Sequence, residues 1–498
     1  MIHITSPGLL RAALFSAMTA FAPTLAEAQT PPAATEAPAA PAAAPAAPPP
    51  AAQAPAAPAP TAQAPSDGAQ PATAAPPARP RPPRPPPPPR VTALSTDPQP
   101  TYGPQTVAVT RSALAQYQQI ARRGGWGTLP PTARLTKGQR GAEVLRLKQR
   151  LAAEGDLPAQ LASGDLFDDA TFAAVQRFQR RVGLLPSGIV AAATIRQLNI
   201  PVEARIRSLE KSLERLAESR FAFGPRYVIV NIPAAAAEAI EGDVVKRRHV
   251  VIVGKQAHAS PMVETRLTVV NFNPTWTIPT SIIKRDIIPR MRRNPATLAN
   301  MRVRILDRSG NEVSPAAIDW STERAVNYTL RQDPGPGNSL GRVRIDMPNT
   351  EAVFMHDTPS RGLFQSDSRT LSSGCVRVAD VSDFVTWLLG PQGFTKEQVV
   401  EGMTQTQRRD VRLTQAVPVA WVYLTGWSAP DGTVQFRDDI YGWDAPGAPP
   451  QTIVRPVQRQ APPPVEVAPQ VQQAPPPPPN FFESIFGTQR GPSADARY

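Results

Sequence analysis

Two residues of the sequence could together carry out nucleophilic chemistry, the cysteine Cys375 and the histidine His356. A thiol with an ordinary pKa of about 8.5 is mostly protonated at neutral pH, so a catalytic cysteine needs an adjacent base or positive charge. The two residues are 19 positions apart, which is enough for a chain leaving one strand end to loop back beside it. We therefore expect Cys375 to be a nucleophile and His356 its proton acceptor and donor.

The neighbours of Cys375 favour this chemistry. Gly374 lets the backbone approach closely, so the N–H groups of Gly374 and Cys375 are candidates for an oxyanion hole. Arg377 has a fixed positive charge that could hold a substrate carboxylate. The chain has one cysteine, which cannot form an internal disulfide and is either a small buried hydrophobe or a reactive group.

The elements that must position these residues are short β-branched runs, with His356 at the end of one of them. They predict a largely antiparallel sheet. The expected strands are 227–232, 249–253, 267–270, 342–347, 352–356, 420–425 and 433–436, with a turn at 430–432 between the last two. The segment 280–325 could form a lid over the cleft, and we assign no role to its charged residues Arg285, Asp286 and Arg290.

Helical patterns precede the sheet. Ser112 could cap a helix that carries Leu114 and Tyr117 on one face. Apolar stripes at helical spacing follow at Val144, Leu147 and Leu151, at Phe172, Val175, Phe178 and Val182, and at Ile206, Leu209, Leu213 and Leu216. The first two stripes, with a short helix around 191–198, predict a small three-helix core, and the third predicts a connecting helix.

Four motifs of the sheet region resemble the YkuD-type L,D-transpeptidases, and most closely their long periplasmic class. They are Asn-Pro-Thr-Trp-Thr-Ile-Pro at 273–279, Pro-Gly-Pro-Gly-Asn-Ser-Leu-Gly-Arg at 334–342, His-Asp-Thr-Pro at 356–359 and Ser-Gly-Cys-Val-Arg-Val at 373–378. The helical segments 135–138, 167–171 and 175–179 resemble the type 1 peptidoglycan-binding domain. For that domain, a core of three amphipathic helices without a binding role is the alternative.

The resemblance implies a mechanism. The Cys375 thiolate would attack the carbonyl of the third residue of a tetrapeptide stem, release D-Ala, and pass the thioester to an amine of a second stem. His356 would act as base and then acid, oriented by the backbone carbonyl of Asp357 or by its carboxylate. Many relatives carry a histidine where this chain has Ser373, which we take as a tolerated variant. Ser373 and Trp276 are candidates for substrate binding, with a core position as the alternative for Trp276.

The amino-terminal sequence is typical of a secretory signal. Arg11 precedes a mostly small or apolar stretch over 12–25, and Ala26-Glu27-Ala28 fits a small-x-small cleavage site. An uncleaved membrane anchor is the alternative. Export predicts a periplasmic or envelope location and argues against nucleic acid as a partner, while the net charge of +13 fits anionic envelope polymers.

Proline composition marks the disordered segments, because residues 31–100 contain 25 of the 62 prolines and residues 446–498 contain 14. The expected fold class is multidomain α+β, with a small three-helix domain and a mainly β catalytic domain. The expected segments are a signal peptide (1–28), a disordered Ala/Pro-rich linker (29–103), a helical scaffold segment (104–134), a peptidoglycan-binding domain (135–200), a connecting helix (201–224), an L,D-transpeptidase catalytic domain (225–445) and a disordered Pro-rich tail (446–498).

Several functional alternatives stay open from the sequence. A same-fold L,D-carboxypeptidase or endopeptidase results if water reaches the thioester before an amine does. A non-catalytic peptidoglycan-binding tether is a second alternative. The expected partners are peptidoglycan stem peptides and glycan, and the apolar segment Phe481–Phe486 could dock an envelope protein or be only a sticky remnant. His249 and His258 have no ligand-type neighbours at suitable spacing, so we expect neither a metal nor a cofactor.

Overall fold

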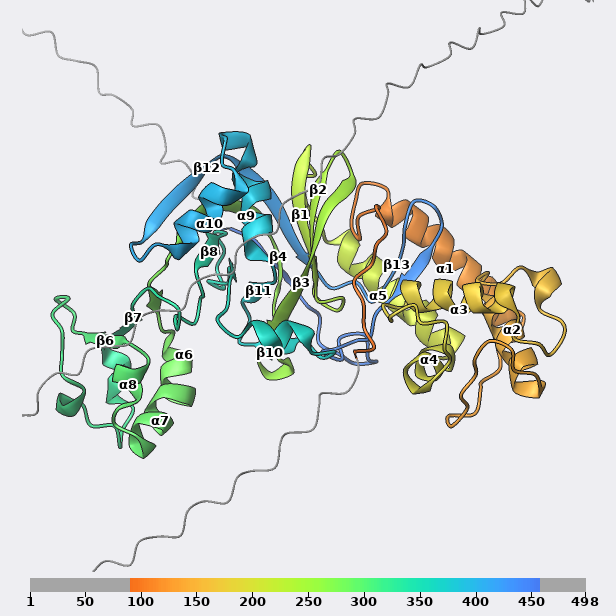
Figure 1. The fold of residues 1–498 in the computed structure, drawn as a ribbon, viewed down its shortest axis with the longest axis horizontal. Coiled ribbons are helices and arrows are strands. Elements are labelled where there is room, and N and C mark those ends of the chain that lie inside the picture. The colour runs from red at the N-terminus through yellow and green to blue at the C-terminus, as the bar shows by residue number, and fades with distance from the viewer. Residues whose placement is uncertain (1–89, 457–498) are drawn as a thin grey trace, which may run out of the picture. The chain divides into compact units, whose positions relative to one another are not determined.

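The computed structural model describes residues 90–456, which form a helical region followed by a mainly β region (Figure 1). The expected signal peptide and the Phe481–Phe486 segment lie outside the described residues. No helix within residues 90–456 is long and apolar enough to cross a membrane.

The helical region contains the predicted three-helix core. Its helices are α1 (Thr106–Arg122), α2 (Ala142–Ala153), α3 (Asp169–Arg181), α4 (Ala192–Leu198) and α5 (Val202–Ala217). Leu147, Leu151 and Phe178 are fully buried between α2, α3 and α4, as their spacing predicts. The carboxylate of Asp168 caps α3 by accepting the Thr171 N–H at 2.8 Å. These contacts form the core of the three-helix unit.

The first helix begins earlier than predicted. It starts at Thr106, and Ser112 lies in its middle, where the hydroxyl donates to the Ala108 carbonyl at 3.4 Å. A serine within a helix commonly bonds back to the carbonyl four residues earlier, so a serine alone does not mark a helix start. Tyr117 is buried at the helix face, as expected. Leu209 and Leu216 of α5 are buried, whereas Phe172 of α3 is only partly so.

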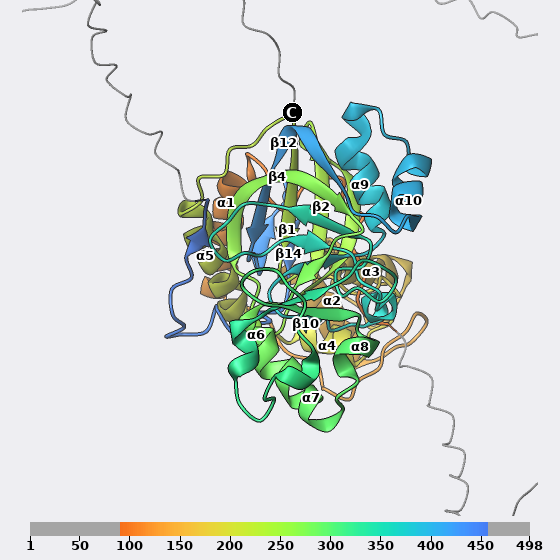
Figure 2. The same ribbon diagram turned by 90° about the vertical axis from the view of Figure 1, so that its left-hand side faces the viewer.

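The mainly β region is built on one ten-stranded sheet. Its strands are β1 (Arg226–Asn231), β2 (Ala236–Glu241), β3 (Val244–Gly254), β4 (Met262–Phe272), β8 (Val343–Asp346), β9 (Met355–His356), β10 (Thr370–Ser372), β11 (Val376–Val378), β12 (Arg409–Val422) and β15 (Ile453–Val454). Their order is β10-β3-β11-β9-β8-β4-β12-β1-β2, and β2 also pairs with β3, so the sheet closes on itself. The strands curve round a shared apolar core (Figure 2).

The sheet differs from the antiparallel prediction at the position that matters for the site. Strands β9 and β11 pair in parallel, as do β1 with β12 and β10 with β3. The predicted strand 420–425 belongs to β12, which ends at Val422. The strand β14 (Val434–Phe436) pairs instead with β13 (Gly426–Ser428), across a turn that includes Gly432 at φ 85°. Helices α9 (Val381–Leu389) and α10 (Lys396–Thr404) pack together beside the sheet.

A separate group of short elements, which we call the small lobe (residues 276–332), has its own apolar core (Figure 1). Its elements are β5 (Trp276–Thr277), α6 (Thr280–Ile282), a π-helical turn (Ile283–Ile287), α7 (Ile288–Arg293), α8 (Thr297–Asn300), β6 (Val303–Leu306) and β7 (Thr329–Gln332). Strands β5, β7 and β6 form a small antiparallel sheet. Ile287, Leu298 and Leu330 are buried beneath it. The lobe contains the predicted lid segment.

The end of the predicted linker is ordered. Thr101 donates from its N–H and its hydroxyl to the Glu238 carboxylate, both at 2.8 Å, and Arg248 donates to the carbonyls of Ser95 and Asp97 at 2.8 Å. Glu238 is only 2% exposed, so its charge needs these donors. The folded part therefore begins by residue 90 and not at 104.

The start of the predicted tail is also ordered. Strand β15 pairs in parallel with β4, and Arg455 forms an ion pair with Glu264 at 2.9 Å. Proline content misled the prediction because Ile453 and Val454, which form the strand, are β-branched and lie before the densest prolines.

Candidate active site

The parallel pairing of β9 and β11 brings the two predicted catalytic residues to one cleft. Met355 is paired with Val376, and His356 with Arg377. Met355 and Val376 are fully buried in the core, and side chains alternate along a strand, so His356 and Arg377 face the other way. His356 and Cys375 both line a cleft of about 350 Å³ on that face. The structure therefore brings the predicted nucleophile and base together.

The imidazole of His356 is held by a backbone carbonyl. Its Nδ1–H donates to the Asp357 carbonyl oxygen at 2.5 Å. The Asp357 carboxylate is used elsewhere, because it accepts the Arg342 N–H at 2.9 Å. Of the two orientations left open by the sequence, the backbone carbonyl is the one observed. With Nδ1 engaged, Nε2 is the ring nitrogen that can exchange a proton, and the Leu340 backbone also acts on the ring.

Burial keeps the imidazole neutral. His356 is 5% exposed, and burial, followed by the positive charges of Arg377 and Arg344, lowers its pKa to about 3. The backbone carbonyl of Asp357 opposes this shift. At neutral pH the ring is therefore a proton acceptor and not an imidazolium.

Burial also keeps the thiol protonated. It raises the pKa of Cys375 to about 11, while the backbone amide of Phe354 and the charges of Arg344 and Arg377 act in the opposite direction. The resting cleft thus holds a neutral thiol and a neutral imidazole, so the thiolate must form as the sulfur attacks.

The loop before β11 holds Cys375 through its backbone. Gly374 adopts φ 113°, a conformation that residues with a side chain rarely adopt. The Ser372 hydroxyl donates to the Cys375 carbonyl at 2.6 Å, and the Ser260 hydroxyl donates to the Gly374 carbonyl at 2.7 Å. Because these bonds tie the loop to itself and to a neighbouring segment, the position of the sulfur is well defined.

One predicted oxyanion donor is occupied. The Gly374 N–H donates to the Ser372 hydroxyl oxygen at 3.2 Å, so it is not free for a substrate oxygen. The bond forms because the Ser372 side chain folds back on its own loop, and the predicted pair of adjacent amides stays a prediction. The Cys375 N–H makes no such bond within residues 90–456 and is the remaining candidate.

The three predicted substrate-binding residues all line the cleft. Arg377 is half-buried, and its Nε atom is buried without an acceptor in the described part of the chain. Ser373 is exposed at the cleft and accepts a hydrogen bond from Arg285 at 3.0 Å. Trp276 lies in β5, where it both lines the cleft and packs on the core of the small lobe, so its two predicted roles are compatible.

Sequence reasoning missed four charged residues of the cleft. Arg285, Asp286 and Arg290 of the small lobe line it, although they were given no role. Arg344 lies across from His356 on β8 and stacks over the Phe354 ring at 4.6 Å. The sequence held a signal for Arg344, because it alternates with buried residues in a predicted strand. No comparable signal pointed to the three small-lobe residues.

Two further histidines, His249 and His258, lie outside the cleft in the described part of the chain. Buried His249 bonds through Nδ1 to the Ala379 carbonyl at 3.1 Å, and burial lowers its pKa. His258 lies on the surface beside Lys255. Within residues 90–456 no three His, Cys, Asp or Glu side chains are grouped so as to hold a metal ion.

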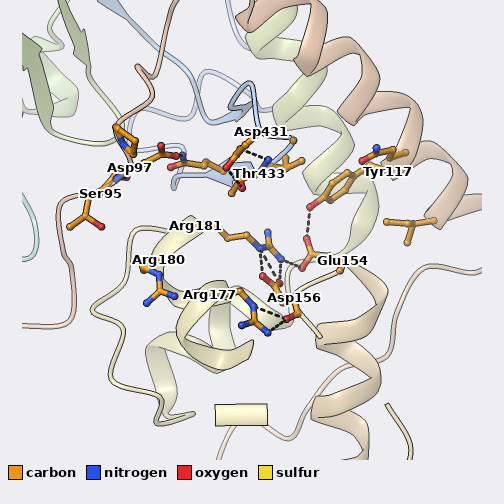
Figure 3. Close-up of a pocket in the computed structure, with 18 residues that line it drawn as sticks. Ser95, Asp97, Tyr117, Glu154, Asp156, Arg177, Arg180, Arg181, Asp431 and Thr433 are labelled. Atoms are coloured by element: carbon orange, nitrogen blue, oxygen red, sulfur yellow. Dashed lines mark hydrogen bonds and ion pairs between the residues drawn. The ribbon is translucent and has the colours of Figure 1, made fainter. Parts of the chain in front are cut away.

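A larger cavity, of about 590 Å³, lies between the helical core and the β13–β14 turn (Figure 3). A buried charge cluster forms part of its wall, in which Arg181 binds the carboxylates of Glu154 and Asp156 at 2.7 and 2.5 Å. Tyr117 donates to Glu154 at 2.7 Å. The cavity contains neither the cysteine nor a histidine, so the smaller cleft is the candidate active site.

Known proteins resemble the chain in both regions. Residues 225–413 match the family model of the L,D-transpeptidase catalytic domain, YkuD, and residues 140–198 match that of the "Putative peptidoglycan binding domain". A Haemophilus influenzae protein described as a "Putative L,D-transpeptidase" is 34% identical over 219 residues. That match covers 44% of each chain, so this chain spans less than half of the length of that relative.

Two solved structures resemble the chain more weakly. An L,D-transpeptidase from Stackebrandtia nassauensis is 12% identical, with a TM-score of 0.23, over 59% of this chain and 96% of that one. An L,D-transpeptidase from Xylanimonas cellulosilytica is 16% identical, with a TM-score of 0.18, over 59% of this chain and 98% of that one. From the matches to the two family models, the chain contains a YkuD-type L,D-transpeptidase catalytic domain and a domain of the type 1 peptidoglycan-binding family.

Proposed function

We propose that the protein is a cysteine-dependent L,D-transpeptidase that forms 3→3 cross-links between peptidoglycan stem peptides. The observation that carries this proposal is the shared cleft of Cys375 and His356, where the Asp357 carbonyl fixes Nδ1 and Nε2 can exchange a proton. A protein that only tethers the wall has no need for a thiol and an oriented imidazole in one cleft.

The proposed first half-reaction moves one proton twice. As the sulfur attacks the carbonyl carbon of the third stem residue, the thiol proton passes to Nε2 of His356. The Cys375 N–H and the nearby Arg377 would stabilise the negative charge that develops on the carbonyl oxygen. When the carbon–nitrogen bond breaks, the imidazolium returns the proton to the leaving amine of D-Ala. A thioester between Cys375 and the stem remains.

The second half-reaction repeats these steps with a different nucleophile. A side-chain amine of an acceptor stem attacks the thioester carbonyl and gives up a proton to His356. The carbon–sulfur bond then breaks, and the sulfur takes the proton back. An amide cross-link forms and the resting thiol is restored, so the cycle needs no oxidant or metal in its balance.

The second domain and the location fit the same proposal. The matches to an L,D-transpeptidase catalytic domain and to a putative peptidoglycan-binding domain support a location in the cell envelope. We propose that the segment 1–28 exports it to the periplasm and that residues 135–200 bind wall peptide or glycan. These roles concentrate the catalytic domain on its polymer substrate.

The test is incubation of the purified protein with disaccharide-tetrapeptides, followed by mass spectrometry. A cross-linked dimer with loss of D-Ala supports transfer, a tripeptide supports the hydrolytic alternative, and no product in any condition supports the tether. The matched control is Cys375→Ala, which we expect to abolish turnover and carbapenem acylation while leaving binding to sacculi intact. Cross-linking by that variant would show that the nucleophile is another residue.

A further inference from the structure

The small lobe faces the nucleophile loop through a π-helical turn. This turn, Ile283–Ile287, lies between α6 and α7 and is followed by Pro289. In this turn the Ile288 N–H donates to the Ile283 carbonyl, five residues earlier, so the turn is wider than an α-helical one. Arg285 and Asp286, on the widened turn, both line the cleft.

These two charges are paired with each other. Arg285 donates through Nε and Nη2 to the two carboxylate oxygens of Asp286, at 3.0 and 2.7 Å. The hydrogen bonds between the two side chains raise the pKa of Arg285 and lower that of Asp286. Such a two-point contact fixes the plane of a guanidinium and leaves its remaining N–H groups in a defined direction.

The fixed guanidinium reaches across the cleft. Nη2 of Arg285 also donates to the Ser373 hydroxyl at 3.0 Å. Within residues 90–456 this is the sole hydrogen bond that joins the small lobe to residues 370–378. Ser373 is two residues before the nucleophile, and its side chain is exposed. The bond therefore connects the small lobe to the loop that carries the thiol.

We propose that Arg285, held by Asp286, is a positioning residue that latches the small lobe onto the nucleophile loop through Ser373. When the latch is closed, the lobe covers the cleft and restricts the approach of large molecules to Cys375. The latch depends on one charge-assisted hydrogen bond at an exposed serine, so it is weak enough to open during each cycle. Its part in turnover rests on the proposed function, but the latch itself does not.

The thiol provides a direct readout, because Cys375 is the only cysteine of the chain. We expect Arg285→Ala to speed alkylation by a bulky maleimide about five- to tenfold, the loss corresponding to one hydrogen bond of ordinary strength at an exposed partner. Iodoacetamide, which is small, should gain much less. Arg293→Ala is the matched control, because Arg293 is an exposed arginine of α7 that does not line the cleft.

A double-mutant cycle separates a latch from a general loosening of the lobe. Ser373→Ala should give the same acceleration as Arg285→Ala, and the double variant no more than either alone. Arg285→Lys should give a maleimide rate between those of the wild type and Arg285→Ala, since lysine keeps the positive charge and a donor group. Multiplying effects in the double variant, or an Arg285→Ala rate equal to that of Arg293→Ala, would overturn the proposal.

The proposed function and the latch fail in different ways. If the wild-type chain makes no product from disaccharide-tetrapeptides, the transpeptidase proposal fails, while the alkylation rates still decide on the latch. Circular dichroism shows whether each variant folds. Should Arg285→Ala not fold, the Ser373→Ala variant alone decides, because an exposed serine side chain adds little to folding stability. An unchanged maleimide rate for Ser373→Ala contradicts the latch.

Discussion

The protonation state of the resting thiol can be tested without any substrate. Burial raises the pKa of Cys375 to about 11, well above the ordinary thiol range of about 8.5 to 9.0. At pH 7 such a thiol is about 0.01% ionised, whereas an ordinary one is about 1% ionised. Only the thiolate is alkylated, so we expect iodoacetamide to react about 100-fold more slowly with the folded chain than with the chain unfolded in urea.

The dependence of the alkylation rate on pH distinguishes a raised thiol pKa from restricted access of the reagent to the thiol. Restricted access lowers the rate by the same factor at every pH, whereas a raised pKa moves the midpoint. With intact-mass spectrometry between pH 6 and 10, the folded-state rate should rise about tenfold per pH unit up to about pH 10. The unfolded chain should level off above its ordinary pKa. The same cysteine serves as its own reference.

A preformed thiolate–imidazolium pair would give the opposite result. Its alkylation rate would be nearly constant from pH 5 to 8, and at pH 7 the folded chain would react faster than the unfolded one. His356→Asn would then slow alkylation strongly, because the counter-charge would be lost. With a neutral imidazole in the resting site, we expect that variant to change the rate less than about threefold. A plateau in the neutral range would refute our reasoning.

Three further predictions concern His356 and its support. His356→Asn should lower carbapenem acylation by about 10²- to 10⁴-fold, measured by mass spectrometry, with an unchanged circular dichroism spectrum; near wild-type acylation would mean another base. In NMR titrations of the folded protein, the His356 imidazole should stay neutral down to about pH 4, because its folded pKa of about 3 lies below the ordinary value of 6.5. The unfolded chain binds this proton more readily, so protonation favours unfolding as the pH falls. A titration midpoint near 6.5 would contradict the prediction. Asp357→Asn should keep acylation within about threefold, because the backbone carbonyl orients the ring; a 100-fold loss would assign that role to the carboxylate.

The sequence predicted the parts of the fold whose local pattern agrees with their final environment. Leu147, Leu151 and Phe178 follow a helical period and are buried on helices. Strand β1 is β-branched and buried on both faces. Strand β2 was missed because its alanines favour a helix locally, while pairing with β1 and β3 on either side imposes an extended chain. Tertiary pairing of this kind leaves no signal in a single segment.

In the candidate site, too, the residues with a distinctive local sequence were predicted and the contacts between distant residues were not. Cys375 and His356 were predicted because their residue types and neighbouring motifs are distinctive. The occupied Gly374 amide and the contact between Arg285 and Ser373 were not, because each depends on a side chain meeting a particular partner. Residues 285 and 373 are 88 positions apart, and no periodic pattern connects them. Single side-chain contacts across a cleft require the fold.

The charges around the cleft indicate which species the site stabilises. Arg344 and Arg377 act to lower the pKa of both Cys375 and His356, so they favour a sulfur anion and disfavour an imidazolium. In the proposed mechanism, an imidazolium formed during attack is therefore short of stabilisation and should pass its proton quickly to the leaving amine. The same charges would favour the negative charge on sulfur or on the carbonyl oxygen throughout. Under this proposal the cleft lowers the energy of the anionic intermediates and holds the proton on sulfur until a substrate arrives.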